Sequence, residues 1–116
     1  MSILLVDDSA DDRLLLQSIL SAAGYEDILA ADSAGAAFKY LALDGGKQAS
    51  ARVDLILMDM LMPQMSGIEA CRQIKAVDRF RDTPIIMVTV KTDPVDLQLA
   101  FAAGAMDYVA KPVNKI

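Results

Sequence analysis

Residues 54–67 read DLILMDMLMPQMSG, an apolar run that ends in a single acid, Asp59, followed by a methionine-rich turn. A short continuous apolar run bounded by polar residues is typical of a strand buried on both faces of a sheet. Two hypotheses compete for this stretch. Its methionines could form a copper site, because thioether sulfur is a soft ligand. Alternatively, the methionines fill space around a chemically active carboxylate, Asp59.

The stretch belongs to a regular alternation of strand and helix patterns. Five short apolar runs predict strands at residues 2–6, 28–31, 53–58, 84–90 and 107–110. Helices are predicted to follow the first four strands and to begin at Ser9, Ser33, Ser66 or Gly67, and Asp93. Residues 44–52 are polar and contain glycine, which indicates a surface loop. We therefore expect one α/β domain over residues 1–116, with a parallel sheet covered by helices on both faces.

The chain stops soon after the last predicted strand. Only residues 111–116 follow it, too few for a closing helix. Asn114 is a residue type that caps helix N-termini, so this helix would begin there. We expect a doubly wound sheet whose last helix is missing or truncated, and a natural chain that continues past residue 116.

Composition narrows the classes of function. The 116 residues are 54% hydrophobic with a net charge of −5, which predicts a folded core and no basic surface for nucleic acid. The absence of histidine excludes histidine-based acid–base catalysis, catalytic triads and most zinc sites. The single cysteine, Cys71, is expected to be an inert helix residue in a reducing compartment. No stretch has the length of a membrane span, and we expect a cytoplasmic protein.

Polar residues collect where the predicted strands end. Asp7 and Asp8 follow the first strand, Asp59 the third, Thr89 closes the fourth, and Lys111 follows the fifth. The carboxyl ends of parallel strands meet at one edge of a sheet, where open α/β folds bind ligands. Three neighbouring carboxylates repel one another unless a cation neutralises them. Oxygen ligands without histidine or cysteine favour Mg²⁺, or Mn²⁺, over zinc and copper.

This set of groups fits phosphoryl transfer. Mg²⁺ coordinates phosphate oxygens, while a hydroxyl and a lysine ammonium bind a phosphoryl group. A carboxylate supplies the missing nucleophile by forming an aspartyl-phosphate. Asp59, alone at the end of the central strand, is the predicted nucleophile. The copper hypothesis lacks the histidine that such sites commonly use, and the methionines are predicted to be packing residues.

Four motifs together resemble the receiver domain of two-component response regulators. They are LLVDDS at residues 4–9, DLILMDMLMPQMSG at 54–67, PIIMVTV at 84–90 and AGAMDYVAKP at 103–112. The resemblance implies a flavodoxin-like, doubly wound sheet with strand order 2-1-3-4-5. It also implies that the phosphoryl donor is a phosphohistidine on a sensor histidine kinase or a histidine phosphotransfer protein, in agreement with the absence of histidine from this chain.

The resemblance gives each site residue a role. Asp59 would accept the phosphoryl group. Asp8 would bind Mg²⁺ directly and Asp7 largely through water, while Asp59 and the backbone carbonyl of Leu61 would complete the metal site. Lys111 would pair with a phosphoryl oxygen.

The resemblance also implies a switch. Thr89 would move to hydrogen-bond the phosphoryl group, and Tyr108 would turn inward with it, although Tyr108 could also be a half-buried edge-strand tyrosine. A cis Lys111–Pro112 bond would hold the lysine in place. Val90 stands where the family usually has a small residue, so we expect slow phosphorylation by small donors and slow hydrolysis. The fourth helix and fifth strand would form the output face and a possible homodimer contact.

Several alternatives stay open. A degenerate receiver would bind a partner without taking phosphate. A haloacid-dehalogenase-like phosphatase would need a second acid where this chain has Leu61, and a flavin phosphate would be repelled by Asp7 and Asp8. The receiver could also regulate an attached output domain, such as a DNA-binding domain or a diguanylate cyclase, since DYVAKPVNKI at residues 107–116 resembles receivers joined to such cyclases.

Overall fold

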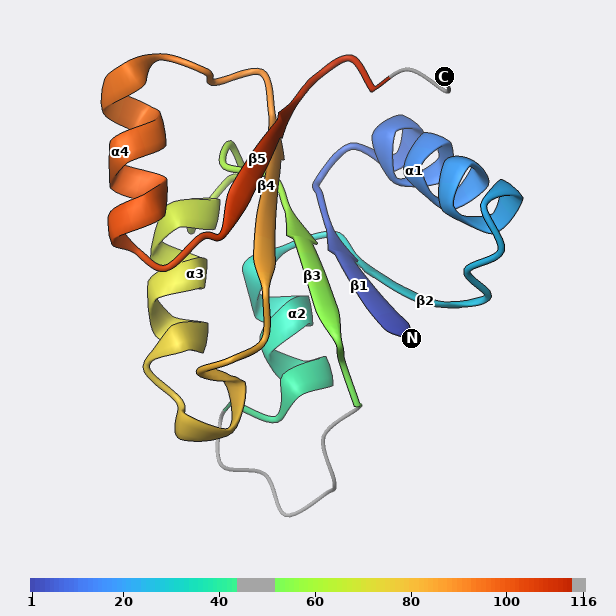
Figure 1. Cartoon of the computed structure of the whole chain (residues 1–116), viewed down its shortest axis with the longest axis horizontal. Helices are drawn as coiled ribbons and strands as arrows, with labels where there is room; N and C mark the ends of the chain where they lie inside the picture. Colours follow the sequence, from blue (N-terminus) through green and yellow to red (C-terminus); the bar gives the residue numbers. More distant parts are fainter. Residues whose placement is uncertain (44–51, 114–116) are drawn as a thin grey trace.

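The structure is a computed structural model that describes residues 1–43 and 52–113. Its parallel strands are β1 (Ser2–Val6), β2 (Asp27–Ala31), β3 (Leu55–Met58), β4 (Ile85–Thr89) and β5 (Asp107–Ala110). They form one five-stranded sheet in the order β2-β1-β3-β4-β5, which confirms the predicted order. The reversal of strand order falls between β1 and β3, at the centre of the sheet (Figure 1).

Two strands are shorter than predicted at their ends. β3 begins at Leu55, and the preceding Asp54 carboxylate accepts a hydrogen bond from the backbone N–H of Ser2 (2.8 Å) at the start of the neighbouring strand. β4 ends at Thr89, and Val90 leaves the sheet with 62% of its surface exposed.

The helices are α1 (Ala10–Ala22), α2 (Ala34–Leu41), α3 (Gly67–Lys75) and α4 (Pro94–Ala102), with an unpredicted 3₁₀ turn, η1 (Asp78–Phe80). The predicted serine caps are confirmed: the hydroxyls of Ser9, Ser33 and Ser66 each accept an N–H bond from the third residue after them. Asp93 is an exception, because its side chain makes no capping hydrogen bond. Its carboxylate lies 3.9 Å from the Lys91 ammonium instead.

Helices cover the two faces of the sheet unequally. α2, α3 and α4 pack on one face, where Ala37, Cys71 and Ala100 lie against the buried side chains of the central strands. On the other face, Leu16 of α1 joins a smaller buried cluster with Ile3, Leu5 and Val88. Within the described residues, α1 is the one helix on this second face (Figure 1).

Two sequence-based expectations lie outside the described residues, namely most of the predicted 44–52 loop and the Asn114 helix cap. In the described part of the chain, every helix is too short or too polar to span a bilayer.

Candidate functional site

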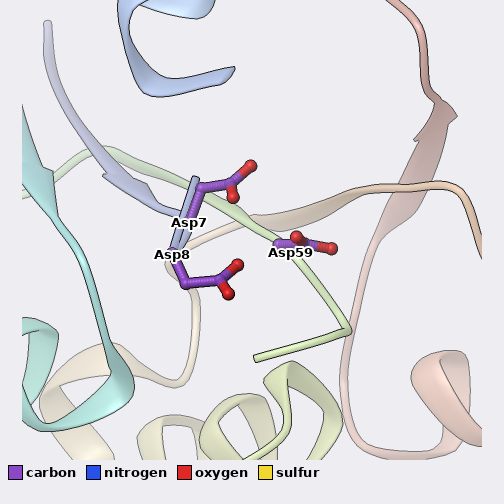
Figure 2. A group of neighbouring side chains, drawn as sticks. All are labelled: Asp7, Asp8 and Asp59. Carbon is purple, nitrogen blue, oxygen red and sulfur yellow. The ribbon is translucent and has the colours of Figure 1, made fainter. Parts of the chain in front are cut away.

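Asp7, Asp8 and Asp59 meet at the carboxyl ends of β1 and β3. Asp7 is 2% exposed and Asp59 is 6% exposed, whereas Asp8 is exposed to solvent. One carboxylate oxygen from each lies within 4.8 Å of the other two, and the side chains of Asp7 and Asp8 extend toward Asp59 (Figure 2). Oxygen donors at this spacing fit a divalent cation such as Mg²⁺ or Mn²⁺. The predicted acidic pocket is therefore present.

The turn after β3 holds Asp59 by close backbone contacts. The Leu61 N–H donates to Oδ1 of Asp59 (3.2 Å), and the Gly67 N–H donates to the Met60 carbonyl oxygen (2.9 Å). A Cβ on Gly67 would lie 1.9 Å from the Asp59 carbonyl oxygen, so no other residue fits at position 67 without moving the turn. The position of the acid thus depends on the start of α3.

The sulfur-containing residues near the site belong to the core. Met58 and Met60 are buried, and Met62 and Met65 pack against the same cluster. The packing interpretation of the methionines is confirmed. Cys71 is also buried, and burial raises the pKa of its thiol to about 11, so the thiol stays protonated at neutral pH.

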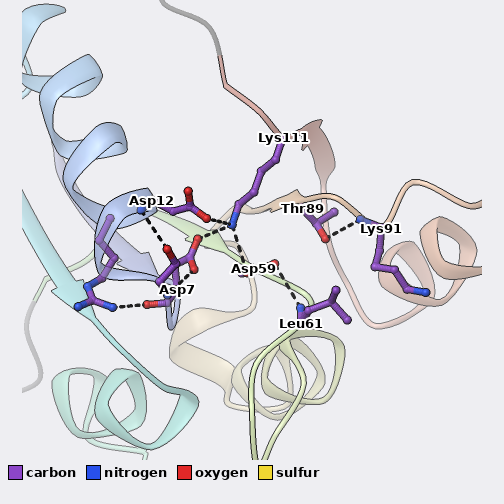
Figure 3. Close-up of polar contacts among 9 residues, drawn as sticks. Asp7, Asp12, Asp59, Leu61, Thr89, Lys91 and Lys111 are labelled. Atoms are coloured by element: carbon purple, nitrogen blue, oxygen red, sulfur yellow. Dashed lines mark hydrogen bonds and ion pairs between the residues drawn. The ribbon is translucent and has the colours of Figure 1, made fainter.

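Lys111 reaches back from the end of β5 into the acidic pocket. Its ammonium lies 2.7 Å from Oδ2 of Asp7, 2.7 Å from Oδ2 of Asp12 and 3.2 Å from Oδ2 of Asp59 (Figure 3). The three N–H donors of the ammonium therefore match three carboxylates. Burial disfavours the ammonium, but the hydrogen bonds with Asp12 and Asp7 and the negative charges of Asp59 and Asp7 together outweigh burial and raise the pKa of Lys111, which stays charged.

The sequence did not reveal the contact with Asp12. Asp12 is an acid in the first turn of α1, where it favours the helix, and no motif joins it to Lys111, 99 residues away. A signal existed in principle: α1 begins at the same sheet edge as the site, so an acid in its first turn lies close to the other strand ends.

Asp59 is held in an environment that disfavours its charge. Burial raises the pKa of its carboxyl group, and the negative charge of Asp7 raises it further. The Leu61 N–H and the Lys111 ammonium act in the opposite direction, yet the pKa remains above the ordinary value. A bound cation that offsets the local negative charge would stabilise the ionised form of this carboxylate.

Thr89 is buried at the end of β4, the strand next to β3. Its hydroxyl oxygen accepts a hydrogen bond from the Lys91 N–H (3.0 Å), and the Lys91 ammonium lies 3.4 Å from the carboxylate of Asp96 on α4 (Figure 3). The structure thus places Thr89 next to the site, but its described hydrogen bond is with its own loop and none is with Asp59.

Tyr108 is 38% exposed on the edge strand β5. Its ring packs edge-to-face against Phe101 of α4, with ring centroids 6.5 Å apart and planes at 70°. This contact fits the half-buried alternative, and the inward movement of Tyr108 stays a prediction. The expected cis peptide bond between Lys111 and Pro112 is confirmed.

Residues 3–116 match the family model described as the response regulator receiver domain. The chain belongs to this family. The receiver domain is 34% identical to the chemotaxis protein CheY1 of Helicobacter pylori strain J99, over 97% of this chain and 86% of the relative. It is 42% identical to a probable cyclic di-GMP phosphodiesterase of Vibrio cholerae, but this match covers only 24% of the relative's length.

The receiver fold is also found in solved structures. The Mn²⁺-bound form of the response regulator Rcp1 superposes with a TM-score of 0.85 at 27% identity, covering 97% of this chain and 82% of that one. The flavodoxin-like prediction is therefore confirmed. A relative solved with Mn²⁺ agrees with the donor set of Asp7, Asp8 and Asp59, which can hold a divalent cation.

Proposed function

We propose that this receiver domain accepts a phosphoryl group on Asp59 from a phosphohistidine on a sensor histidine kinase or a histidine phosphotransfer protein. One observation carries the proposal: a buried carboxylate ends the central strand, beside two further acids and within 3.2 Å of a lysine ammonium. We also propose that it acts in the cytoplasm, where such donors and a reducing environment for Cys71 are found.

The residues of the chain divide the chemistry among them. An oxygen of Asp59 attacks phosphorus, the P–N bond to the donor imidazole breaks, and the imidazole nitrogen keeps the electron pair. Lys111 is placed to neutralise the charge of a phosphoryl oxygen next to Asp59. Asp7, Asp8, Asp59 and the Leu61 carbonyl would hold Mg²⁺, which supplies charge neutralisation when bound. Mn²⁺ would serve in the same donor set.

The phosphoryl group would then change the output face through Thr89. The Thr89 hydroxyl oxygen accepts the Lys91 N–H at present, and the hydroxyl proton would be donated to a phosphoryl oxygen. Tyr108 would follow and turn away from Phe101. Apolar side chains are exposed on α4, on β5 and in the turn between them, at Val95, Leu99, Phe101, Met106, Tyr108 and Val109, and the rings of Phe101 and Tyr108 meet on one face. Such a face suits a homodimer contact or an output partner.

The complete set of reactive groups separates this proposal from its rivals. A degenerate receiver has no need of Asp59, Thr89 and Lys111 together at one edge of the sheet. A haloacid-dehalogenase-like phosphatase would need an acid at Leu61. Relatives whose names indicate chemotaxis and cyclic di-GMP hydrolysis match equally long parts of this chain. The similarity to these relatives therefore does not identify the output domain or partner of this receiver. An attached diguanylate cyclase or another output domain remains a proposal.

The direct test is transfer of phosphate to the purified protein. With Mg²⁺ and a phosphorylated histidine kinase or acetyl phosphate, intact-mass spectrometry should detect one added phosphoryl group. Asp59→Asn should abolish the product, and a chelator should prevent it. Asp54→Asn is the matched control, since Asp54 lies at the opposite end of the same strand and should leave transfer intact. Absence of transfer together with no Mg²⁺-dependent binding of beryllofluoride would favour the degenerate receiver.

A further inference from the structure

The Lys111 ammonium has three partners, and one of them is outside the acidic pocket. Asp7 and Asp59 belong to the group that can hold a metal, whereas Asp12 lies in the first turn of α1. The contact with Asp12 (2.7 Å) is as short as that with Asp7 and shorter than that with Asp59 (3.2 Å). Among the described residues, Asp12 is the one acid that binds the lysine without also belonging to the pocket.

We infer that Asp12 is a positioning residue that holds Lys111 to one side of the pocket, so that the ammonium stays beside Asp59 without occupying the place of the cation. This inference rests on the proposed function and deepens it.

The physical reason is competition between two cations for the same oxygens. An ammonium fully engaged with Asp7 and Asp59 would occupy oxygens that the metal needs, and its charge would repel Mg²⁺. Asp12 takes one of the three ammonium donors and draws the positive charge toward α1. Without Asp12, the lysine would have only acids of the pocket left as close carboxylate partners among the described residues.

The position of Asp12 is fixed by its helix. Its backbone N–H donates to the Ser9 hydroxyl (3.2 Å), which caps α1, and its side chain lines a small hollow with Leu16, Lys111 and Val113. The side chain of Lys111 is 12% exposed and that of Asp12 is 39% exposed, so the pair is partly buried and water screens it less than a pair on the open surface. The geometry therefore restrains the lysine on the α1 side.

Asp11 provides a matched control. It is the other acid in the first turn of α1, it is exposed, and Lys111 pairs with Asp12 and not with Asp11 in the described structure. Substitution of either acid removes one negative charge near the same helix N-terminus. An effect of Asp12 that Asp11 lacks therefore reports the contact with Lys111 rather than helix stability or net charge.

The test measures binding of MgCl₂ alone by calorimetry, with no phosphoryl donor present. Asp12→Ala should weaken Mg²⁺ binding by about threefold to tenfold, the scale of coupling between contacting charges, while Asp11→Ala changes it by less than about twofold. Asp12→Asn, which keeps an acceptor oxygen but loses the charge, should fall between Asp12→Ala and the wild type. In a Lys111→Met background the effect of Asp12→Ala should disappear.

The outcomes separate the inference from the proposed function. Equal effects of Asp12→Ala and Asp11→Ala, or an Asp12 effect that persists without Lys111, would overturn the positioning role. The wild-type transfer assay decides the proposed function independently. Mg²⁺ binding that depends on Asp12 in a protein that takes no phosphate would support the positioning of the lysine while rejecting Asp59 as an acceptor.

Discussion

On the α1 side of Asp59, one ammonium holds three carboxylates together, whereas on the α4 side Thr89 is bonded to its own loop and Tyr108 packs against Phe101. We call the first group, Asp7, Asp12, Asp59 and Lys111, the lysine side, and the second, Thr89, Lys91, Phe101 and Tyr108, the switch side. The lysine side has the acids and the ammonium that the proposed phosphoryl transfer would use. On the switch side, Thr89 and Tyr108 contact Lys91 and Phe101, and in the proposed switch Tyr108 would leave Phe101. We infer from this difference that the residues proposed for phosphoryl transfer are in place before phosphorylation, whereas the residues proposed for the switch would move after it.

The largest effect is expected from removing the lysine. Lys111→Met leaves neighbouring carboxylates without their cation and should cost about 3 kcal/mol of unfolding free energy without Mg²⁺. Because the pKa of Lys111 is raised above its ordinary value of 10.5, its contribution is fully present at neutral pH and is lost only as the pH rises past that value. Urea unfolding at pH 7 measures the loss.

Lys91→Met is the control on the switch side. Lys91 is half-exposed, and its pairs with Asp93 and Asp96 are 3.9 and 3.4 Å long. Its loss should cost less than about 1 kcal/mol. Equal losses for Lys91→Met and Lys111→Met would remove the contrast between the two sides.

The second prediction concerns the cation. Mg²⁺ at a hundredfold excess over its dissociation constant should raise the unfolding free energy of the wild type by about 2.7 kcal/mol. Asp8 is exposed, so Asp8→Asn should change the metal-free stability by less than about 0.5 kcal/mol yet remove most of the Mg²⁺ effect. Thermal unfolding with and without Mg²⁺ tests both statements, and a full Mg²⁺ effect in Asp8→Asn would exclude Asp8 as a ligand.

The third prediction uses the pKa of Asp59. A carboxyl group whose pKa is raised on folding destabilises the fold when ionised, so stability falls as the pH rises through that pKa. Asp59→Asn should therefore stabilise the metal-free protein at pH 7 by about 1 kcal/mol. The gain should disappear at acidic pH, where Asp59 is protonated in both states. A gain of equal size at all pH values would contradict this origin.

The smallest effect is expected on the switch side. Phe101→Ala removes the ring that holds Tyr108 in its present position, a contact of about 1 kcal/mol. If inward Tyr108 belongs to the phosphorylated state, the variant should bind beryllofluoride about fivefold more tightly. Val95→Ala, at an exposed position of the same helix, is the control and should leave binding unchanged. Weaker binding by Phe101→Ala would indicate that the pair supports the active state.

The sequence predicted the parts of the site that follow from where strands end. An apolar run followed at once by an acid gives both the strand and the location of Asp7 or Asp59, because the end of a parallel strand lies at a defined edge of the sheet. The serine caps were predictable for a similar reason, since a cap acts within three residues.

The contacts that the sequence did not predict are those in which a side chain has more than one possible partner. Asp93 has the residue type of a cap, but the nearby Lys91 ammonium attracts its carboxylate. The Asp12–Lys111 and Phe101–Tyr108 pairs join elements whose relative position is set by the whole fold. No local pattern distinguishes Asp12 from its neighbour Asp11, because only the packed structure shows which of the two faces the lysine.

The contacts of Lys111 also bear on the order of events during folding. They join it to residues 104, 99 and 52 positions earlier in the chain. Closing loops of this length is entropically costly, and contacts of large sequence separation slow folding. On a ribosome, β1 and β3 are synthesised long before the lysine that neutralises their acids. The acidic pocket thus acquires its ammonium only after all five strands have been synthesised.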